Sequence, residues 1–250
     1  AWCGRLSGQA PDLILASSPQ LPAAFTSLCI ARLIGIPLVL EVRDLWPQVL
    51  IDQGGQRENQ PMVRLLRWME QVLYRQAAVV VVLARGAEPY VRERGARRTA
   101  WLPNGPDLEL FQQQPLPQPG PAFTVLYAGA HGAANALETV IEAARWLQSQ
   151  GSSVQLRLVG DGPEKPALIR QAAALTNLRF EAPLPKASIP ALMAEADAIL
   201  LSLRDVPLFR YGVSPNKLYD AYAIARPVVT TVPGDINDEV IAEAIGVAAV

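Results

Sequence analysis

The residues best suited to hold a charged ligand lie in the segment Arg210 to Val229, RYGVSPNKLYDAYAIARPVV. Ser214 followed by Pro215 is typical of a helix start, with the serine as N-cap and the proline as the first helical residue. The next backbone amides then lack intrahelical partners, and amides at the positive end of a helix bind phosphate. These amides belong to Asn216, Lys217 and Leu218.

Two cations and one carboxylate accompany this helix start. Arg210 and Lys217 can add positive charge beside a phosphate, and Asp220 lies one turn beyond Lys217 on the same face. A carboxylate there can accept hydrogen bonds from two ribose hydroxyls while the helix start holds a diphosphate. The same pattern also fits an ordinary capped helix with a surface Lys–Asp pair, and spacing alone does not separate the two interpretations.

A loop of small residues, Gly129 to Asn135, joins an expected strand to an expected helix. Small residues let a phosphate approach backbone amides. The loop is not a dinucleotide fingerprint, because Gly129 and Gly132 have a Gly-x-x-Gly spacing and no acidic residue follows about twenty positions on. It carries His131, the only histidine in the chain, which is either an active-site residue or a solvated polar side chain.

Charged residues stand at two other expected strand ends. Asp161 follows Gly160 and precedes Pro163, where a helix is expected to begin, so it either caps that helix or faces a ligand. Arg43 and Asp44 end an apolar strand in the first half, and charged groups at such a place must be paired if they are buried. They form either a structural ion pair or part of a substrate grip.

The composition excludes several other classes of protein. Half of the 250 residues are hydrophobic and the net charge is −1, so the chain can build buried cores but lacks a broad basic surface for nucleic acid. Cys3 and Cys29 have no metal-ligand spacing, which fits a reduced, cytoplasmic setting. The most apolar run, Leu21 to Leu40, contains a charge and two helix breakers, so it predicts a buried helix and strand rather than a membrane span.

Short β-rich runs alternate with amphipathic helical stretches, a pattern typical of parallel α/β sheets. The expected strands are residues 13–16, 38–42, 79–83, 99–102, 124–127, 154–159, 178–180, 198–201, 228–231 and 246–250. The expected helices are residues 22–33, 61–76, 86–93, 134–148, 163–174, 188–194, 215–224 and 235–244.

A proline-rich and glutamine-rich stretch, Pro103 to Ala122, interrupts this alternation and predicts a linker. We therefore expect an α/β chain with two doubly wound, Rossmann-like domains, at residues 1–105 and 123–250, joined by residues 106–122. Ligands of such sheets bind beyond the carboxyl ends of the strands, here in a cleft that the two domains face. We also expect both ends of the chain to be truncated, because the first strand begins late and the last one ends the chain.

Seven motifs along nearly the whole chain resemble those of the retaining glycosyltransferases of the GT-B fold, group 1 (family 4). Within this family they are most similar to a bacterial surface-polysaccharide subgroup that includes the fucosamine transferases of O-antigen synthesis. The motifs are ASSPQLPAAF, EVRDLWPQ, LPNGPDLELF, YAGAHGAANALETVIEAA, LVGDGPEK, PLPKASIPALMAEADAILLSL and LFRYGVSPNKLYDAYAIARPVV.

The resemblance implies transfer of a hexose or N-acetylaminosugar from a nucleotide-diphosphate donor, with uracil as its base, and no metal or other cofactor. It implies a glycan or polyprenyl-diphosphate-linked acceptor at the inner face of the plasma membrane, with the enzyme in the cytoplasm and in peripheral contact with that face. The basic helix that carries Arg64, Arg67, Trp68 and Arg75 is compatible with such a contact, although its residues favour an ordinary solvated helix surface.

The resemblance also implies roles for single residues. The catalytic set is Lys217, Arg210 and Asp220, with Lys217 at the diphosphate and Asp220 at the ribose. The base meets the backbone at Leu184, and Arg43 and Asp44 reach in from the N-terminal domain. The donor-binding set is Gly129, His131, Gly132, Gly160, Asp161, Leu184, Ser214, Asn216 and Leu218.

Several positions depart from the family pattern. Members commonly carry two glutamates separated by seven residues, and these positions hold Gly212 and Asp220 here, so the first carboxylate is missing. The arginine and lysine common after the first strand of this domain are absent from Ala130 to Asn135, and Arg43 stands where many relatives have histidine. Two alternatives therefore stay open: a nucleotide-sugar 2-epimerase of the same architecture, and a non-catalytic sugar-nucleotide-binding protein.

Overall fold

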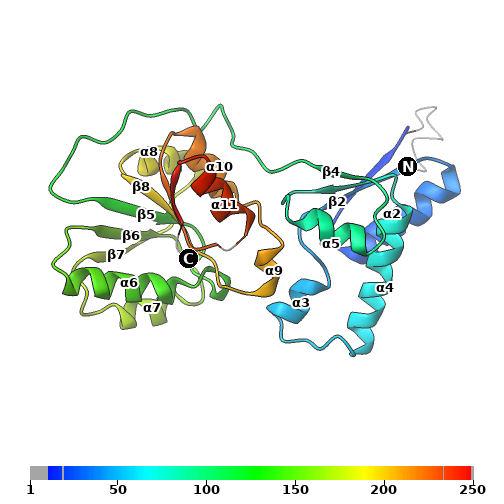
Figure 1. The fold of residues 1–250 in the computed structure, drawn as a ribbon, viewed down its shortest axis with the longest axis horizontal. Helices are drawn as coiled ribbons and strands as arrows, with labels where there is room; N and C mark the ends of the chain where they lie inside the picture. Colours follow the sequence, from blue (N-terminus) through cyan, green and yellow to red (C-terminus); the bar gives the residue numbers. More distant parts are fainter. Residues whose placement is uncertain (1–10, 19, 233, 249–250) are drawn as a thin grey trace. The chain divides into compact units, whose positions relative to one another are not determined.

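The computed structural model describes residues 11–18, 20–232 and 234–248. Its contacts divide the chain into two compact units. The first unit is residues 1–103 with residues 206–214, and the second is residues 104–205 with residues 215–250. Each unit contains a parallel sheet with helices around it (Figure 1). The expected borders at residues 105 and 122 stay a prediction.

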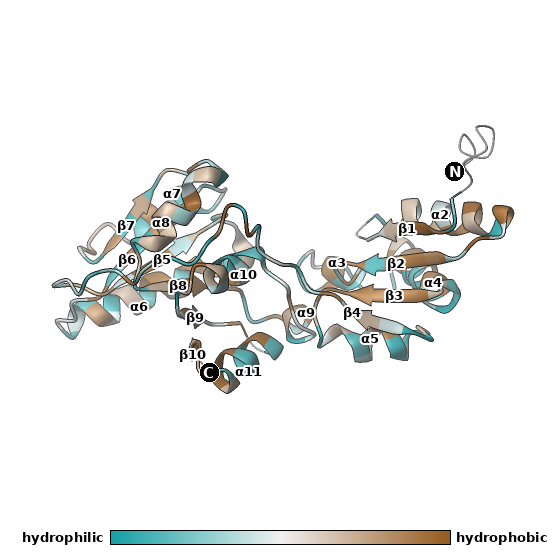
Figure 2. Ribbon diagram, turned by 90° about the horizontal axis from the view of Figure 1, so that it is seen from above, coloured by the Kyte–Doolittle hydropathy of each residue, from teal (hydrophilic) through white to brown (hydrophobic). Residues whose placement is uncertain are grey.

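The first unit contains a sheet of four parallel strands that follow one another in chain order. They are β1 (Ile14–Ser17), β2 (Leu38–Val42), β3 (Val79–Val82) and β4 (Thr99–Trp101). The four consecutive valines of β3 are largely buried, as expected where helices cover a parallel sheet. Figure 2 shows this apolar character along β3 and most of β2.

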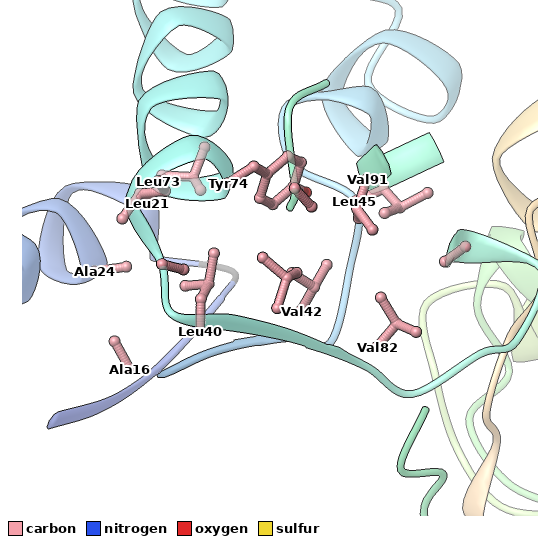
Figure 3. Packing of buried hydrophobic residues seen from close by; sticks show 14 of the residues in the cluster. Ala16, Leu21, Ala24, Leu40, Val42, Leu45, Leu73, Tyr74, Val82 and Val91 are labelled. Atoms are coloured by element: carbon pink, nitrogen blue, oxygen red, sulfur yellow. The ribbon is translucent and has the colours of Figure 1, made fainter. Parts of the chain in front are cut away.

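The described residues of the first unit form the helices α2 (Leu21–Ile34), α3 (Gln48–Asp52), α4 (Pro61–Gln76), α5 (Ala87–Glu93) and α9 (Pro207–Arg210). The core forms where α2 and α4 meet the sheet. Figure 3 shows Leu40 and Val42 of β2 on the side of the strand that faces Leu73 and Tyr74 of α4. Leu40 and Leu73 are fully buried. The face of α4 that carries its periodic apolar residues is therefore the face that packs against the sheet.

The second unit contains six parallel strands in the order β10-β9-β8-β5-β6-β7. The strands are β5 (Thr124–Ala128), β6 (Gln155–Val159), β7 (Leu178–Glu181), β8 (Ala198–Leu201), β9 (Val228–Thr230) and β10 (Gly246–Ala248). The chain lays β6 and β7 on one side of β5 and then returns to place β8 on the other side. The strand order therefore reverses between β5 and β8, which confirms the doubly wound, Rossmann-like expectation for this unit.

The helices of the second unit are α6 (Leu137–Ser149), α7 (Lys165–Gln171), α8 (Ile189–Ala194), α10 (Asn216–Ala223) and α11 (Asp235–Ala242), with short 3-10 turns η1 (Ala133–Asn135) and η2 (Lys186–Ser188). Two predicted helix starts differ from the observed ones by more than one residue. Helix α6 begins three residues late because η1 precedes it and Ala136 has a positive φ of 47°. Helix α7 begins at Lys165 rather than Pro163, after an N-cap at Glu164.

Candidate functional site

A pocket of about 540 Å³ lies in the second unit at the carboxyl ends of β5, β6 and β7. This size is ordinary for a small-molecule site, and the place is the reversal of strand order where such sheets bind ligands. Polar side chains at the pocket are Asp161, Lys186, Asn216, Lys217 and Asp220. Apolar ones are Phe111, Val159, Leu184, Ile189, Met193 and Ile199.

Backbone hydrogen bonds tie the strand-end loops together beneath the pocket. The amide of Gly129 donates to the carbonyl of Val159 at 2.9 Å, and the amide of His131 donates to the carbonyl of Asp161 at 2.8 Å. Gly160 has a φ of 143°, and a Cβ built on it would lie 1.9 Å from the carbonyl oxygen of Gly129. Only glycine fits there, because the two loops touch backbone to backbone.

Lys217 brings a positive charge into this pocket from the first turn of α10. Its ammonium lies 4.1 Å from the centre of the Tyr127 ring, and no carboxylate of the described residues forms an ion pair with it. Burial disfavours its charged form and lowers the pKa of Lys217 to about 8. A partly buried cation without a counter-ion can bind an anionic ligand, because the ligand supplies the missing opposite charge.

The start of α10 differs from the sequence prediction in two ways. The helix begins at Asn216 with Pro215 as its N-cap, so Pro215 is not the first helical residue and Ser214 is not the N-cap. The amide of Leu218 donates to the carbonyl of Pro215 at 3.0 Å, and its side chain is buried in the core. The expected free amide at Leu218 is therefore wrong, and the amides of Asn216 and Lys217 remain the first two of the helix.

Arg210 and Ser214 belong to the first unit, in and after α9, and not to the unit that contains Lys217. The expectation that both serve the same pocket as Lys217 therefore stays a prediction. Gly212, which takes the place of the family's first carboxylate, has a φ of 93°. This backbone conformation favours glycine.

Asp220 lines the pocket one turn beyond Lys217, as the spacing predicts. Burial raises the pKa of Asp220, while the charge of Lys186 opposes that effect. Lys186 itself lies 3.6 Å from the carboxylate of Asp107 in an exposed ion pair. Asp220 is therefore a half-buried acceptor at the pocket wall with a cation nearby, which is an environment suited to hydroxyl groups.

His131 does not lie in the pocket wall. Its side chain is fully buried between the rings of Tyr127 and Phe180, with ring centres 6.0 Å and 5.9 Å away. Burial lowers the pKa of His131, and Lys165 lowers it further, so the ring is neutral at pH 7. The interpretation as a solvated polar side chain is wrong, and the residue contributes its backbone to the loop instead. Gly132 lies in the same loop, outside the pocket lining.

The other predicted residues have definite places. Gly129, Gly160, Asp161 and Leu184 all line the pocket. The carboxylate of Asp161 accepts a hydrogen bond from the amide of Gly162 at 2.8 Å, so it closes its own turn and does not cap α7.

Arg43 and Asp44 are exposed after β2 in the first unit. Arg43 forms no ion pair with any residue that the structure describes, so the interpretation as a structural bridge is wrong. Arg67 also differs from expectation: its guanidinium turns inward to Glu70 at 3.0 Å and to Tyr90, which removes it from the proposed lipid-facing surface.

The sequence analysis missed Phe111, which lines the pocket, and Tyr127, whose ring lies behind the pocket residue Lys217. Phe111 is 1 % exposed although it falls in the stretch predicted as a linker. That stretch is held by the buried guanidinium of Arg226, which donates to the carbonyls of Gln114 at 3.1 Å and Ala194 at 2.8 Å. A large aromatic residue among prolines and glutamines was the available signal, because such a side chain rarely stays in solvent.

Two kinds of feature are not found in the described part of the chain. Within residues 11–18, 20–232 and 234–248, no three His, Cys, Asp or Glu side chains gather in a way that could hold a metal ion. None of the helices in these ranges has the length and the apolar character that crossing a membrane requires.

The chain has two units, each with a parallel α/β sheet, and the second unit has a pocket where its strand order reverses. This is the architecture of the GT-B fold. The family model "Glycosyl transferases group 1" matches residues 122–248, and the model "Glycosyl transferase 4-like domain" matches residues 1–105. The chain therefore belongs to the group 1 glycosyltransferases, as its motifs predict.

Curated relatives agree with this family. The chain is 26% identical over 242 residues to "Probable glycosyltransferase WbjE" of Pseudomonas aeruginosa, which covers 90% of this chain and 56% of the relative. It is 25% identical over 237 residues to WcaI of Escherichia coli K12, a glycosyl transferase assigned to colanic acid biosynthesis, with 88% and 57% covered. The chain thus spans little more than half the length of these relatives.

Solved structures agree with the fold. Sucrose-phosphate synthase of Thermosynechococcus elongatus matches with a TM-score of 0.74 and 18% identity, over 99% of this chain and 63% of the other. HepE of Anabaena, solved in complex with UDP, matches with a TM-score of 0.70 and 19% identity, over 94% and 64%. At these identities the matches establish the GT-B architecture alone.

Proposed function

We propose that the chain transfers a sugar from a UDP-linked donor to a glycan or lipid-linked acceptor, with retention of configuration. One observation carries this proposal: the pocket at the strand-order reversal presents the Lys217 ammonium without a counter-ion, next to the half-buried Asp220. A nucleoside diphosphate offers the groups that match these residues, two phosphates for the cation and ribose hydroxyls for the carboxylate.

The donor lies along the pocket with its parts in separate places. The diphosphate takes the Lys217 ammonium and the amides of Asn216 and Lys217, over the small loop that begins at Gly129. The ribose takes Asp220, and the base takes the backbone at Leu184 and the apolar wall that includes Phe111. The UDP complex of HepE supports uracil as the base, since that protein has a similar fold.

Catalysis rests on stabilising the leaving diphosphate. As the glycosidic bond to the donor phosphate breaks, negative charge grows on the phosphate oxygen, and the nearby ammonium and amides stabilise that charge without rearranging. No side chain of the pocket is placed as an evident nucleophile. We therefore propose attack by the acceptor hydroxyl on the face from which the diphosphate leaves, with the departing phosphate accepting the hydroxyl proton.

The acceptor and the cellular place are proposed from the family resemblance. The assignment of WcaI to colanic acid biosynthesis supports a role in cell-surface polysaccharide synthesis, and for such a role we propose a glycan or polyprenyl-diphosphate-linked acceptor at the inner face of the plasma membrane. The enzyme would then work in the cytoplasm and touch that membrane peripherally. O-antigen is the polysaccharide that the resemblance favours.

One observation favours a second candidate, a sugar-nucleotide-binding protein without transferase activity. Gly212 cannot supply the carboxylate that relatives place near the donor sugar. Product analysis after incubation with UDP-sugars separates the cases. Transfer to an acceptor supports the first proposal, intact donor supports the second, and an epimerised donor would contradict both.

Calorimetric titration with UDP tests the donor site itself. Lys217→Ala and Asp220→Ala should each weaken UDP binding at least about tenfold, because each removes a direct charged partner. Arg170→Ala and Glu142→Ala change exposed charges of α7 and α6 outside the pocket and serve as matched controls. UDP affinity that is lost equally in the controls, or retained in both pocket variants, would sink this assignment.

A further inference from the structure

The Tyr127 side chain touches both parts of the proposed phosphate site. Its ring lies in β5, two residues before Gly129, and is fully buried. The Lys217 ammonium lies 4.1 Å from the ring centre, while the Tyr127 hydroxyl donates to the carbonyl of Ala130 at 2.7 Å. One aromatic residue therefore contacts the cation from α10 and the small loop from β5.

An aromatic ring, rather than a carboxylate, is the partner of the Lys217 ammonium, and this choice suits a site for an anionic ligand. An aromatic face attracts an ammonium through its quadrupole, without a formal negative charge. A carboxylate in the same place would neutralise the lysine and repel an arriving phosphate. The ring fixes the ammonium while leaving its full charge and its N–H donors available to a ligand.

Gly129 shows how closely this contact is built. A Cβ on Gly129 would lie 2.8 Å from the Lys217 ammonium nitrogen and 3.2 Å from the Tyr127 hydroxyl. The lysine arm therefore crosses directly over the glycine to reach the ring. A side chain at residue 129 would displace the end of the flexible lysine rather than the backbone of the sheet.

We infer that Tyr127 is a positioning residue for the phosphate site: its ring face holds the Lys217 ammonium, and its hydroxyl fixes the loop at Ala130. The inference rests on the proposed function for what Lys217 binds, but the contact itself exists without ligand. By this inference, phosphate binding depends on an aromatic ring at the end of β5 as well as on the charged residues.

The other titratable groups around the site do not replace this contact. His131 and Asp161 stand on the two loops, and Asp220 lies one turn along α10. The Lys165 ammonium is engaged by the carbonyls of Gly160 and Glu181, both at 2.6 Å. Burial lowers the pKa of Lys217, whereas the face of the Tyr127 ring attracts the ammonium and opposes this effect. Replacing the ring by an apolar side chain that keeps the amine buried should therefore lower the pKa further.

The test compares Tyr127→Phe with Tyr127→Leu. Phenylalanine keeps the ring face and loses the hydroxyl, whereas leucine is apolar and loses both. Competitive acetylation of amines across a pH series, read by mass spectrometry on the Lys217 peptide, gives the titration midpoint of Lys217 in the ligand-free chain. Circular dichroism and thermal melting establish that each variant is folded.

Tyr127→Phe should keep the Lys217 midpoint, and Tyr127→Leu should lower it by about one pH unit, the size expected for loss of a desolvated cation–π contact. UDP affinity should fall a few-fold in Tyr127→Phe and at least about tenfold in Tyr127→Leu. If Tyr127→Leu does not fold, Gly129→Ala pushes the Lys217 ammonium off the ring, because its Cβ would meet the ammonium nitrogen at 2.8 Å, and it should lower the midpoint in the same direction.

An unchanged midpoint and unchanged UDP affinity in folded Tyr127→Leu would overturn the inference. So would an equal midpoint change in Tyr127→Phe, since the ring is retained there. Failure of the unsubstituted chain to bind UDP would instead contradict the proposed function, while the acetylation comparison would still decide whether Tyr127 holds Lys217.

Discussion

The pH dependence of UDP binding follows from the environment of Lys217. Without ligand, burial lowers the pKa of Lys217 to about 8, from an ordinary value of 10.5. A diphosphate binds the protonated amine and raises its pKa again. The contribution of this amine to UDP affinity should therefore be constant up to about pH 7, and the affinity should fall about twofold by pH 8 and about tenfold by pH 9, as linkage requires for one proton.

Calorimetry in buffers of different ionisation enthalpy measures this linkage directly. At pH 8 about half a proton should be taken up for each UDP bound, and at pH 6.5 almost none from this amine. Comparison is clean above about pH 7, where the terminal phosphate of UDP is already ionised. Lys217→Met should bind weakly at every pH and lose the decline between pH 8 and 9. Affinity that stays level to pH 9 in the unsubstituted chain, or proton release on binding, would refute the reasoning.

Three further substitutions test the site's construction by thermal or chemical unfolding. Gly160→Ala should lower the unfolding free energy by about 3 kcal/mol or more, because its Cβ would lie 1.9 Å from the carbonyl oxygen of Gly129. A melting temperature like that of the parent would contradict this close packing and show that the two loops can separate. Lys217→Met should raise the unfolding free energy at pH 7 by about 2 kcal/mol, since the folded state then avoids burying a charge. This gain over the parent should shrink as pH rises from 8 toward 10.5. A gain of the same size at pH 7 and pH 10.5 would contradict the lowered pKa. Phe111→Ala should cost about 3 kcal/mol and weaken UDP binding, whereas a freely mobile linker would tolerate it.

Local patterns in the sequence predicted most of the regular structure. The apolar run of β2 (Leu38–Val42) and the periodic helix α4 (Pro61–Gln76) occur at the predicted residues, because burial on a sheet selects such patterns strongly. Errors fall where short polar segments leave no periodicity. Helices α3 and α9 are five and four residues long and were not predicted.

The site likewise has features that the sequence predicted and features that it did not. Glycines after β5 and β6 and the Lys217 to Asp220 spacing were visible, since close backbone approach and helix periodicity leave direct traces in sequence. The burial of His131 and the contact of Tyr127 with Lys217 were not visible. Phe180 of β7 packs on His131, and Lys217 of α10 lies on the Tyr127 ring, so both contacts depend on elements that are distant from β5 in the sequence.

The central claim is that the pocket of the second unit holds the donor nucleotide. The most direct test is photolabelling of the chain with 5-azido-UDP, with and without excess UDP, followed by peptide mapping. The account predicts label on the pocket segments around Leu184 and Lys217 to Asp220, suppressed by UDP and reduced in Lys217→Ala. Label confined to the first unit, or label that excess UDP does not suppress, would contradict it.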